Sequence, residues 1–123
     1  MSNKIKTFKY FSKKGYKHYT ENTIEELDKL PLSNHHIITE FTHLREWLRV
    51  NHGIWVTVFT NKSENWKTLF SFRLDWIYPE DTPDLEDIEP KYYKILDFIK
   101  NEYSSPQEAY SAAFHYIQQN NLI

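Results

Sequence analysis

The chain has no cysteine, and its 123 residues include only two glycines and one methionine. The absence of cysteine excludes disulfide bonds, thiol catalysis and cysteine-ligated zinc, and it fits a reducing compartment. With Gly15 and Gly53 alone, the chain cannot build a glycine-rich loop around phosphates, and neither a P-loop nor a G-x-S-x-G motif occurs. No run approaches the roughly 20 apolar residues of a membrane span, and residues 1–9 lack the apolar stretch of a secretion signal. The sequence therefore predicts a soluble intracellular protein.

Aromatic residues, in contrast, are abundant. Tyrosine, phenylalanine and tryptophan make up 17% of the chain, with nine, eight and four residues respectively. A chain of 123 residues has the size of one domain, and folded chains of this length bury roughly two-thirds of their extended surface. We therefore expect a single domain, residues 1–123, with a core built largely from rings.

Residues 39–78 show the clearest pattern of secondary structure, a helix followed by a β-hairpin. Apolar residues at helical spacing, among them Phe41 and Leu44, predict a helix from Thr39 to His52. Gly53 follows directly, and glycine most easily adopts the left-handed conformation that ends a helix. The polar residues of this helix are expected to face water: Glu40, Arg45, Glu46 and Arg49.

Two strands are predicted after this helix. Every residue from Ile54 to Phe59 is β-branched or aromatic, which is typical of a strand. Residues 61–65 are polar and have the length of a hairpin connection. From Phe70 to Trp76 apolar and polar side chains alternate, which predicts a half-buried antiparallel strand over residues 68–76.

Two capping boxes indicate where further helices begin. In a capping box, a hydroxyl and a carboxylate three residues later satisfy each other's backbone donors. The first box, Thr23-Ile24-Glu25-Glu26, predicts a short helix from Ile24 to about Leu30. The second, Ser105-Pro106-Gln107-Glu108, places proline in the first turn and predicts a helix over residues 106–119.

The remaining segments complete the predicted fold. Weak alternation on both sides of a turn at residues 12–15 predicts a basic β-hairpin over residues 1–20. Residues 79–90 are acidic and bounded by prolines, which indicates a surface loop. Residues 91–99 fit a strand or a helix, and a strand is favoured because two strands bury a sheet face poorly. The predicted class is α+β: a single two-layer domain in which two main helices pack on one face of an antiparallel sheet, with the N-terminal β-hairpin at an edge.

The net charge of −2 conceals two segments of opposite charge. Residues 1–20 carry lysines and no acid, whereas residues 80–89 carry acids and no base. The two segments can face each other, or each can face a partner. The candidate partner-binding residues of the acidic segment are Glu80, Asp81, Asp84, Glu86, Asp87 and Glu89.

The basic segment supports a hypothesis of nucleic-acid binding, because lysines neutralise phosphates and aromatic rings stack on unpaired bases. The order helix, strand, strand, possible strand and helix also matches double-stranded RNA-binding domains. Those domains need a basic start to the last helix, which Ser105–Glu108 does not provide, and the pI of about 6.3 is also unfavourable. The residues that would bind nucleic acid are Lys6, Lys9, Lys13, Lys14, Lys17, Tyr10 and Tyr16.

Patterns that indicate catalysis or metal binding are sparse. Glu40 and His43 have the Glu-x-x-His spacing of di-iron bundles, but such sites need the motif twice, and the sequence has no second copy. The acidic segment lacks the glycine that an EF-hand requires. We therefore expect no catalytic residue, no metal and no cofactor, and a metal-dependent enzyme is the most remote alternative.

Two stretches carry a resemblance to other proteins: Trp47-Leu48-Arg49-Val50-Asn51-His52, followed by a strand pair, and Tyr103-Ser104-Ser105-Pro106-Gln107-Glu108-Ala109-Tyr110. Over residues 40–123 the chain resembles a group of small uncharacterised proteins of bacteriophages and of Bacteroides-type gut bacteria. In that group a W-L-R-x-x-H helix end precedes a hairpin, and a tyrosine-rich S-P-x-E-A helix closes the chain. The resemblance implies a phage or prophage context, with no established activity and no catalytic residue.

The leading functional hypothesis is a non-enzymatic binding or regulatory protein, phage-associated and located in the cytoplasm of the host cell. It would act through contacts with a host protein or with a second copy of itself in a homodimer. No membrane partner is expected. The alternative is a nucleic-acid-binding module that uses the N-terminal hairpin. The sequence leaves open the identity of any partner and the oligomeric state.

Overall fold

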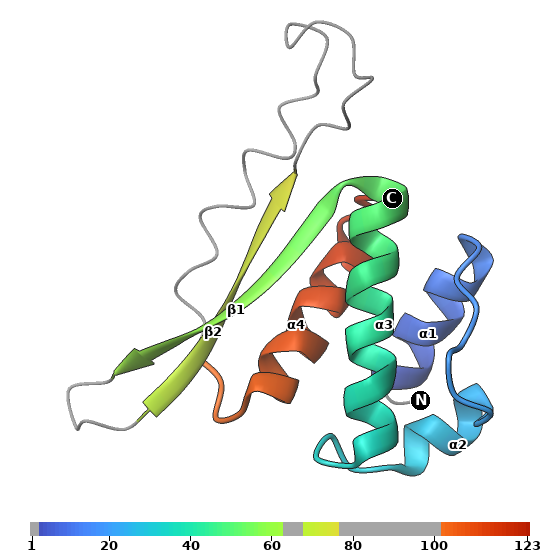
Figure 1. Ribbon diagram of the computed structural model, residues 1–123, viewed down its shortest axis with the longest axis horizontal. Coiled ribbons are helices and arrows are strands. Elements are labelled where there is room, and N and C mark those ends of the chain that lie inside the picture. Colours follow the sequence, from blue (N-terminus) through green and yellow to red (C-terminus); the bar gives the residue numbers. More distant parts are fainter. Residues whose placement is uncertain (1–2, 63–67, 77–101) are drawn as a thin grey trace, which may run out of the picture.

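The computed structural model of the chain describes residues 3–62, 68–76 and 102–123. These residues form α1 (Asn3–Lys13), α2 (Ile24–Lys29), α3 (His35–His52), β1 (Ile54–Lys62), β2 (Thr68–Trp76) and α4 (Pro106–Gln119). Figure 1 shows α3 and α4 on the same side of the strand pair, with α1 and α2 beyond them. The α+β fold class is confirmed.

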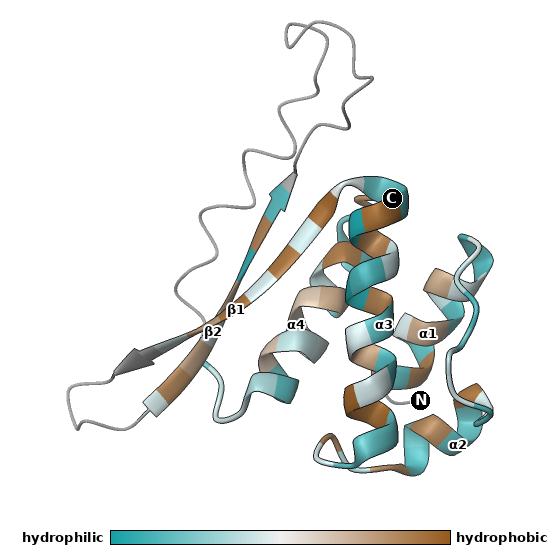
Figure 2. Ribbon diagram, viewed as in Figure 1, coloured by the Kyte–Doolittle hydropathy of each residue, from teal (hydrophilic) through white to brown (hydrophobic). Residues whose placement is uncertain are grey.

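The two strands pair antiparallel over their whole length, from Ile54 opposite Trp76 to Lys62 opposite Thr68. In the first part of β1, residues of high hydropathy alternate with less hydrophobic ones (Figure 2). Val56 and Leu74, which lie opposite each other, are buried on the face that meets the helices. Helix α4 contacts both strands and α3 contacts β1. The expected packing of two main helices on one sheet face is therefore present.

The expected N-terminal hairpin is wrong, because this segment is helix α1. Phe8 and Phe11, at helical spacing, are 1% and 0% exposed, and both belong to the core. The turn expected at residues 12–15 is the end of this helix. The N–H of Gly15 donates to the carbonyl of Ser12, and that of Tyr16 donates to Phe11. With φ of 103° at Gly15, this is a Schellman motif, which ends a helix.

Helix α3 starts at His35, four residues before the expected start at Thr39. The side chain of Asn34 accepts a hydrogen bond of 2.9 Å from the N–H of His36 and caps the helix. Thr39 lies within the helix and donates to the carbonyl of His35. The end at Gly53 is as expected, with φ of 68°. The other predicted starts, after Thr23 and Ser105, are also confirmed.

Glu40 is buried, although we expected it to face water. Its carboxylate accepts a hydrogen bond of 2.5 Å from the hydroxyl of Tyr16. The backbone N–H and the hydroxyl of Thr20 both donate to its other oxygen at 2.8 Å. Burial, followed by the hydrogen bond to Glu40, raises the pKa of Tyr16. This cluster fastens the connection between α1 and α2 to α3.

Two of the segments considered above, the acidic residues 79–90 and the ambiguous residues 91–99, lie outside the described residues. Just before α4, Tyr103 exchanges two backbone hydrogen bonds with Phe70 on the edge of β2 that faces away from β1. None of the helices in the described part of the chain has the length and apolar character needed to cross a membrane.

Candidate functional site

The lysines of the proposed nucleic-acid site are exposed, but the rings named with them are engaged elsewhere. The hydroxyl of Tyr10 donates a hydrogen bond of 2.9 Å to the carbonyl of Ile123. Tyr16 is only 3% exposed, and its hydroxyl donates a hydrogen bond to Glu40. Stacking on bases would therefore require these rings to leave their present contacts. The lysines that remain on the surface are Lys6, Lys9, Lys13, Lys14 and Lys17.

The acidic residues proposed for partner binding lie outside the described residues, so the structure does not place them. Of the Glu-x-x-His pair, Glu40 is held by Tyr16 and Thr20. His43 is exposed, and the centroid of its ring lies 4.5 Å from the centroid of the Tyr19 ring. In the part of the chain that the structure describes, no group of three or more potential ligands can hold a metal ion.

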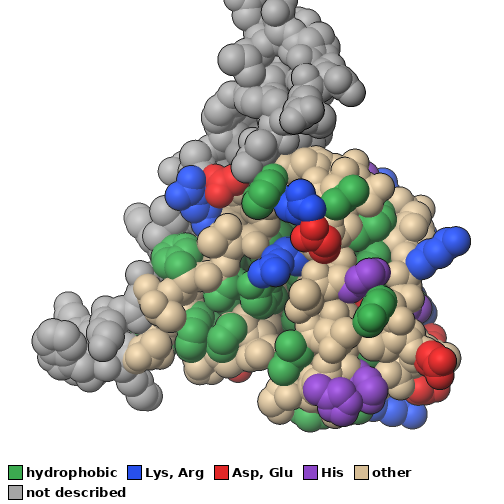
Figure 3. Space-filling view, viewed as in Figure 1, with side chains coloured by type: hydrophobic (Ala, Val, Ile, Leu, Met, Phe, Trp, Pro, Cys, Tyr) green, Lys and Arg blue, Asp and Glu red, His purple; other side chains and the backbone are tan. Residues whose placement is uncertain are grey.

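A groove of about 340 Å³ opens where α3, α4 and the first half of β1 meet. Figure 3 shows basic and acidic side chains gathered beside hydrophobic ones near the centre of this face. Helix α3 contributes three charged residues and α4 contributes one ring, whereas the strand provides consecutive residues. The groove is lined by Arg45, Glu46, Arg49, Trp55, Val56, Thr57, Val58 and Tyr110.

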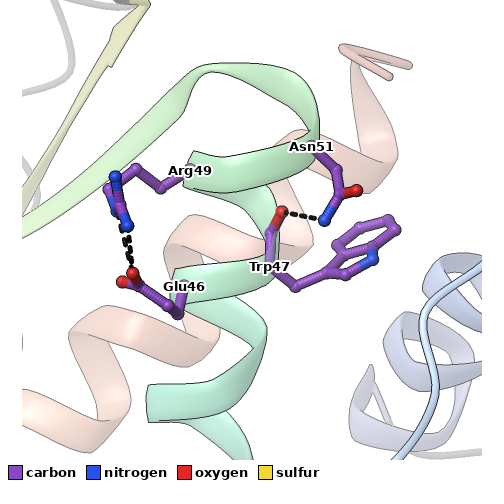
Figure 4. A network of polar contacts seen from close by, with 4 residues as sticks. All are labelled: Glu46, Trp47, Arg49 and Asn51. Atoms are coloured by element: carbon purple, nitrogen blue, oxygen red, sulfur yellow. Dashed lines mark hydrogen bonds and ion pairs between the residues drawn. The ribbon is translucent and has the colours of Figure 1, made fainter.

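Contacts within the groove position both arginines. Arg45 donates a hydrogen bond of 2.8 Å from Nη1 to the hydroxyl of Tyr110. The guanidinium of Arg49 lies 5.3 Å from the centroid of the Trp55 ring, a cation–π contact. The same guanidinium forms an ion pair with Glu46 (Figure 4). Because Arg45 and Arg49 are four residues apart, they lie on one face of α3.

The described residues of the lining carry an excess of positive charge, since they hold two guanidinium groups and one carboxylate. The hydrogen bond from Arg49 lowers the pKa of Glu46, which therefore stays ionised at neutral pH. Arginine is always protonated in proteins. Proton transfer near neutral pH needs a group that titrates there, so the arrangement suits binding of an anion better than acid–base catalysis.

Among the described residues, β1 has an open hydrogen-bonding edge on the side away from β2. The backbone N–H and C=O of Phe70 point toward Tyr103. Phe70 therefore forms no backbone hydrogen bond with Thr60, the residue opposite it on β1. Bonded and non-bonded pairs alternate in an antiparallel ladder. Val58 and Val56 lie two and four residues before Thr60 on β1, so they also form non-hydrogen-bonded pairs with β2. Their N–H and C=O groups therefore point away from β2. Among the described residues, none pairs with these outward groups.

Sequence reasoning missed this groove. The sequence pattern predicts only a solvated helix face for Arg45 and Arg49 and only a strand for Trp55. Their spacing, four residues apart just before an aromatic strand, was the available signal. Tyr110 could not be added without the tertiary structure, because it lies 65 residues after Arg45.

A second hollow, of about 400 Å³, lies along α3 beside the connection to α2. Tyr19 and Ile38, which are 62% and 38% exposed, give it apolar surface. Glu46 is the one acid among the described residues that line it, and Glu46 also lines the first groove. Because these described residues include neither a strand edge nor an arginine, this hollow offers fewer directional contacts than the groove.

No protein-family model, no curated protein and no solved structure matches the chain.

Proposed function

We propose that this chain is a non-enzymatic binding or regulatory protein that acts through contacts with another protein, and that the groove of α3, α4 and β1 is the contact surface. One observation carries the proposal: the outward backbone groups of Val56 and Val58 lie beside two arginines. An open strand edge is a template for pairing with another chain, and extended peptides often bind by adding a strand to such an edge.

The side chains around the edge also suit a protein interface. Trp55 is 39% exposed, and it is held by Arg49 rather than buried in the core. Tryptophan, tyrosine and arginine are the residues most enriched among those that dominate binding energy. The groove combines all three types.

A partner other than a second copy is favoured. Pairing of two β1 edges around a two-fold axis would place the same surface of both copies at one interface. The interface would then contain Arg45 and Arg49 from each copy, and like charges brought together repel. A phage or prophage context, which the sequence resemblance implies, would make a host protein the partner.

The test is selection from a display library of random linear peptides, with the whole chain as target. The replacement Val58→Pro removes the outward N–H, whereas Val58→Ala shortens the same side chain and keeps that N–H. Circular dichroism establishes that both variants fold. We expect the selected peptides to bind the wild type and Val58→Ala but not Val58→Pro. Peptides that bind Val58→Pro equally well, or a lack of enrichment on the wild type, would contradict the proposal.

The lysines of α1 support a second candidate function, binding of nucleic acid. Lys6, Lys9 and Lys13 are exposed at spacings of three and four residues, so they share one side of the helix. Fluorescence anisotropy with single- and double-stranded oligonucleotides at low salt tests this function. Binding that disappears on replacing Lys13, Lys14 and Lys17 by glutamate would support it, and no binding at low salt would exclude it.

A further inference from the structure

We propose that the occupant of the groove is an extended acidic segment, and that its carboxylate takes the place of Glu46 on Arg49. This inference rests on the proposed function and specifies the chemistry of the partner. In the free protein, Glu46 forms the ion pair with Arg49 that the ligand carboxylate forms in the complex (Figure 4).

The strand edge determines the conformation of the ligand. The outward groups of Val56 and Val58 provide two N–H donors and two C=O acceptors at the spacing of alternate strand residues. A segment that pairs with them must itself be extended, and its side chains alternate between the two faces of the enlarged sheet. Every second side chain then points toward the helices, where Arg45 and Arg49 lie.

The spacing of the arginines fits such a strand. Residues four apart in a helix are separated by about 6 Å along its axis, and alternate residues of a strand are separated by about 6.6 Å. Two carboxylates on alternate residues of the ligand can therefore reach Arg45 and Arg49, because long arginine side chains accommodate the remaining difference. Arginine and carboxylate also form paired, parallel hydrogen bonds.

The charge of the groove favours an acid over a neutral segment. Glu46 compensates only one of the two guanidinium groups. Its side chain is 54% exposed and that of Arg49 is 38% exposed. Exposed ion pairs are weak, so a ligand carboxylate can displace Glu46. Arg45 has no carboxylate partner among the described residues, and Tyr110 holds it toward the groove.

The test uses two synthetic seven-residue peptides with acetylated and amidated ends, one alternating threonine with glutamate and the other threonine with glutamine. They have nearly the same shape and strand propensity and differ in charge. Titration into the full chain at low salt gives both affinities. We expect the glutamate peptide to bind at least about tenfold more tightly, since each charge-assisted hydrogen bond is roughly twice as strong as a neutral one.

Replacing residues of α3 tests the exchange with Glu46. We expect Glu46→Gln to strengthen binding of the glutamate peptide about two- to five-fold, because the competing carboxylate is gone. The affinity for the glutamine peptide should not change. Arg45→Gln and Arg49→Gln should each weaken binding of the glutamate peptide about five-fold or more. Lys9→Gln, which removes an exposed positive charge of α1, is the matched control and should change the affinity by less than about two-fold.

The outcomes separate this inference from the proposed function. Equal affinity for both peptides, with both lost in Val58→Pro, would overturn the acidic ligand and leave groove binding intact. If neither peptide binds, while library selection still yields ligands that depend on Val58, the acidic ligand is likewise overturned and groove binding is left intact. Binding of the glutamate peptide that is insensitive to Val58→Pro and Arg45→Gln would place it elsewhere and overturn the inference.

Discussion

The hydroxyl of Tyr110 accepts a hydrogen bond of 2.8 Å from Arg45, and this bond joins α4 to α3 beside the open edge of β1. The guanidinium also lies 5.7 Å from the centroid of the Tyr110 ring, so one aromatic side chain contacts it in two ways. Arg45 is therefore oriented before any ligand arrives. A group that is already oriented loses less conformational entropy on binding.

Replacing Tyr110 by phenylalanine removes the acceptor of this bond and keeps the ring. We expect the free energy of unfolding to fall by about 1 kcal/mol, and the affinity for the glutamate peptide to fall about two- to three-fold, because Arg45 is no longer held. Urea unfolding and titration measure the two effects. Tyr19→Phe, at an exposed ring in the connection between α1 and α2, is the control. An unchanged affinity for Tyr110→Phe would show that Tyr110 does not position Arg45.

The buried carboxylate of Glu40 is expected to be important for stability. Glu40→Ala removes the carboxylate to which the hydroxyl of Tyr16 and the N–H of Thr20 donate, and leaves Tyr16 only the backbone carbonyl of residue 40 at 3.5 Å. Unsatisfied buried groups cost about 1–3 kcal/mol each, so we expect a loss of about 3 kcal/mol in urea unfolding. Glu40→Gln keeps one oxygen and should cost less. Glu25→Ala, at an exposed position of α2, should stay within about 0.5 kcal/mol of the wild type. Equal stability of Glu40→Ala and Glu25→Ala would refute this role.

Lys4 of α1 is expected to stabilise the end of α2. Its ammonium donates to the carbonyl of Leu30 and, at 3.5 Å, to that of Leu27. Burial lowers the pKa of Lys4, and the charge of Asp28 partly offsets this effect. We expect Lys4→Met to lower the free energy of unfolding by about 1 kcal/mol, because the two carbonyls lose a donor. Lys6→Met, on the exposed side of the same helix, is the control; an equal loss there would contradict the assignment.

His52 is expected to make stability depend on pH. Burial, followed by the charge of Lys14, lowers the pKa of His52 below its ordinary value of 6.5. As the pH falls through 6.5, the unfolded chain takes up this proton before the folded chain does, and stability decreases. The contribution is complete above 6.5 and is lost once the pH is below the folded pKa. His52→Gln should therefore flatten the decrease between pH 7.5 and 5.5 in urea unfolding, whereas an unchanged slope would contradict the account.

The sequence predicted the strands and three of the four helices in the described residues, because local signals marked them. Capping boxes at Thr23 and Ser105 and a glycine at position 53 act within a few residues. The helix over residues 3–13 was missed for a different reason. Its rings fit two-residue alternation as well as helical spacing, and only packing of Phe8 and Phe11 into the core decides between the two.

The candidate site was less predictable than the fold. Glu40 and Arg45 have the same polar character in the sequence, yet one is buried and the other lines a groove. Their different environments arise because Tyr16 and Tyr110, distant in the sequence, fold against them. The residues of β1 whose backbone groups point outward are identified by the contact of Phe70 with Tyr103, which no local pattern indicates.

Hydrogen exchange at single amides of β1 tests the central claim most directly. In the free protein, we expect the amides of Val56 and Val58 to exchange rapidly, because they point away from β2. Trp55 and Thr57, whose amides pair with β2, should exchange slowly. A saturating amount of the threonine–glutamate peptide should slow Val56 and Val58 at least about tenfold. Slow exchange of these two amides in the free chain, or no slowing while the peptide is bound, would contradict the account.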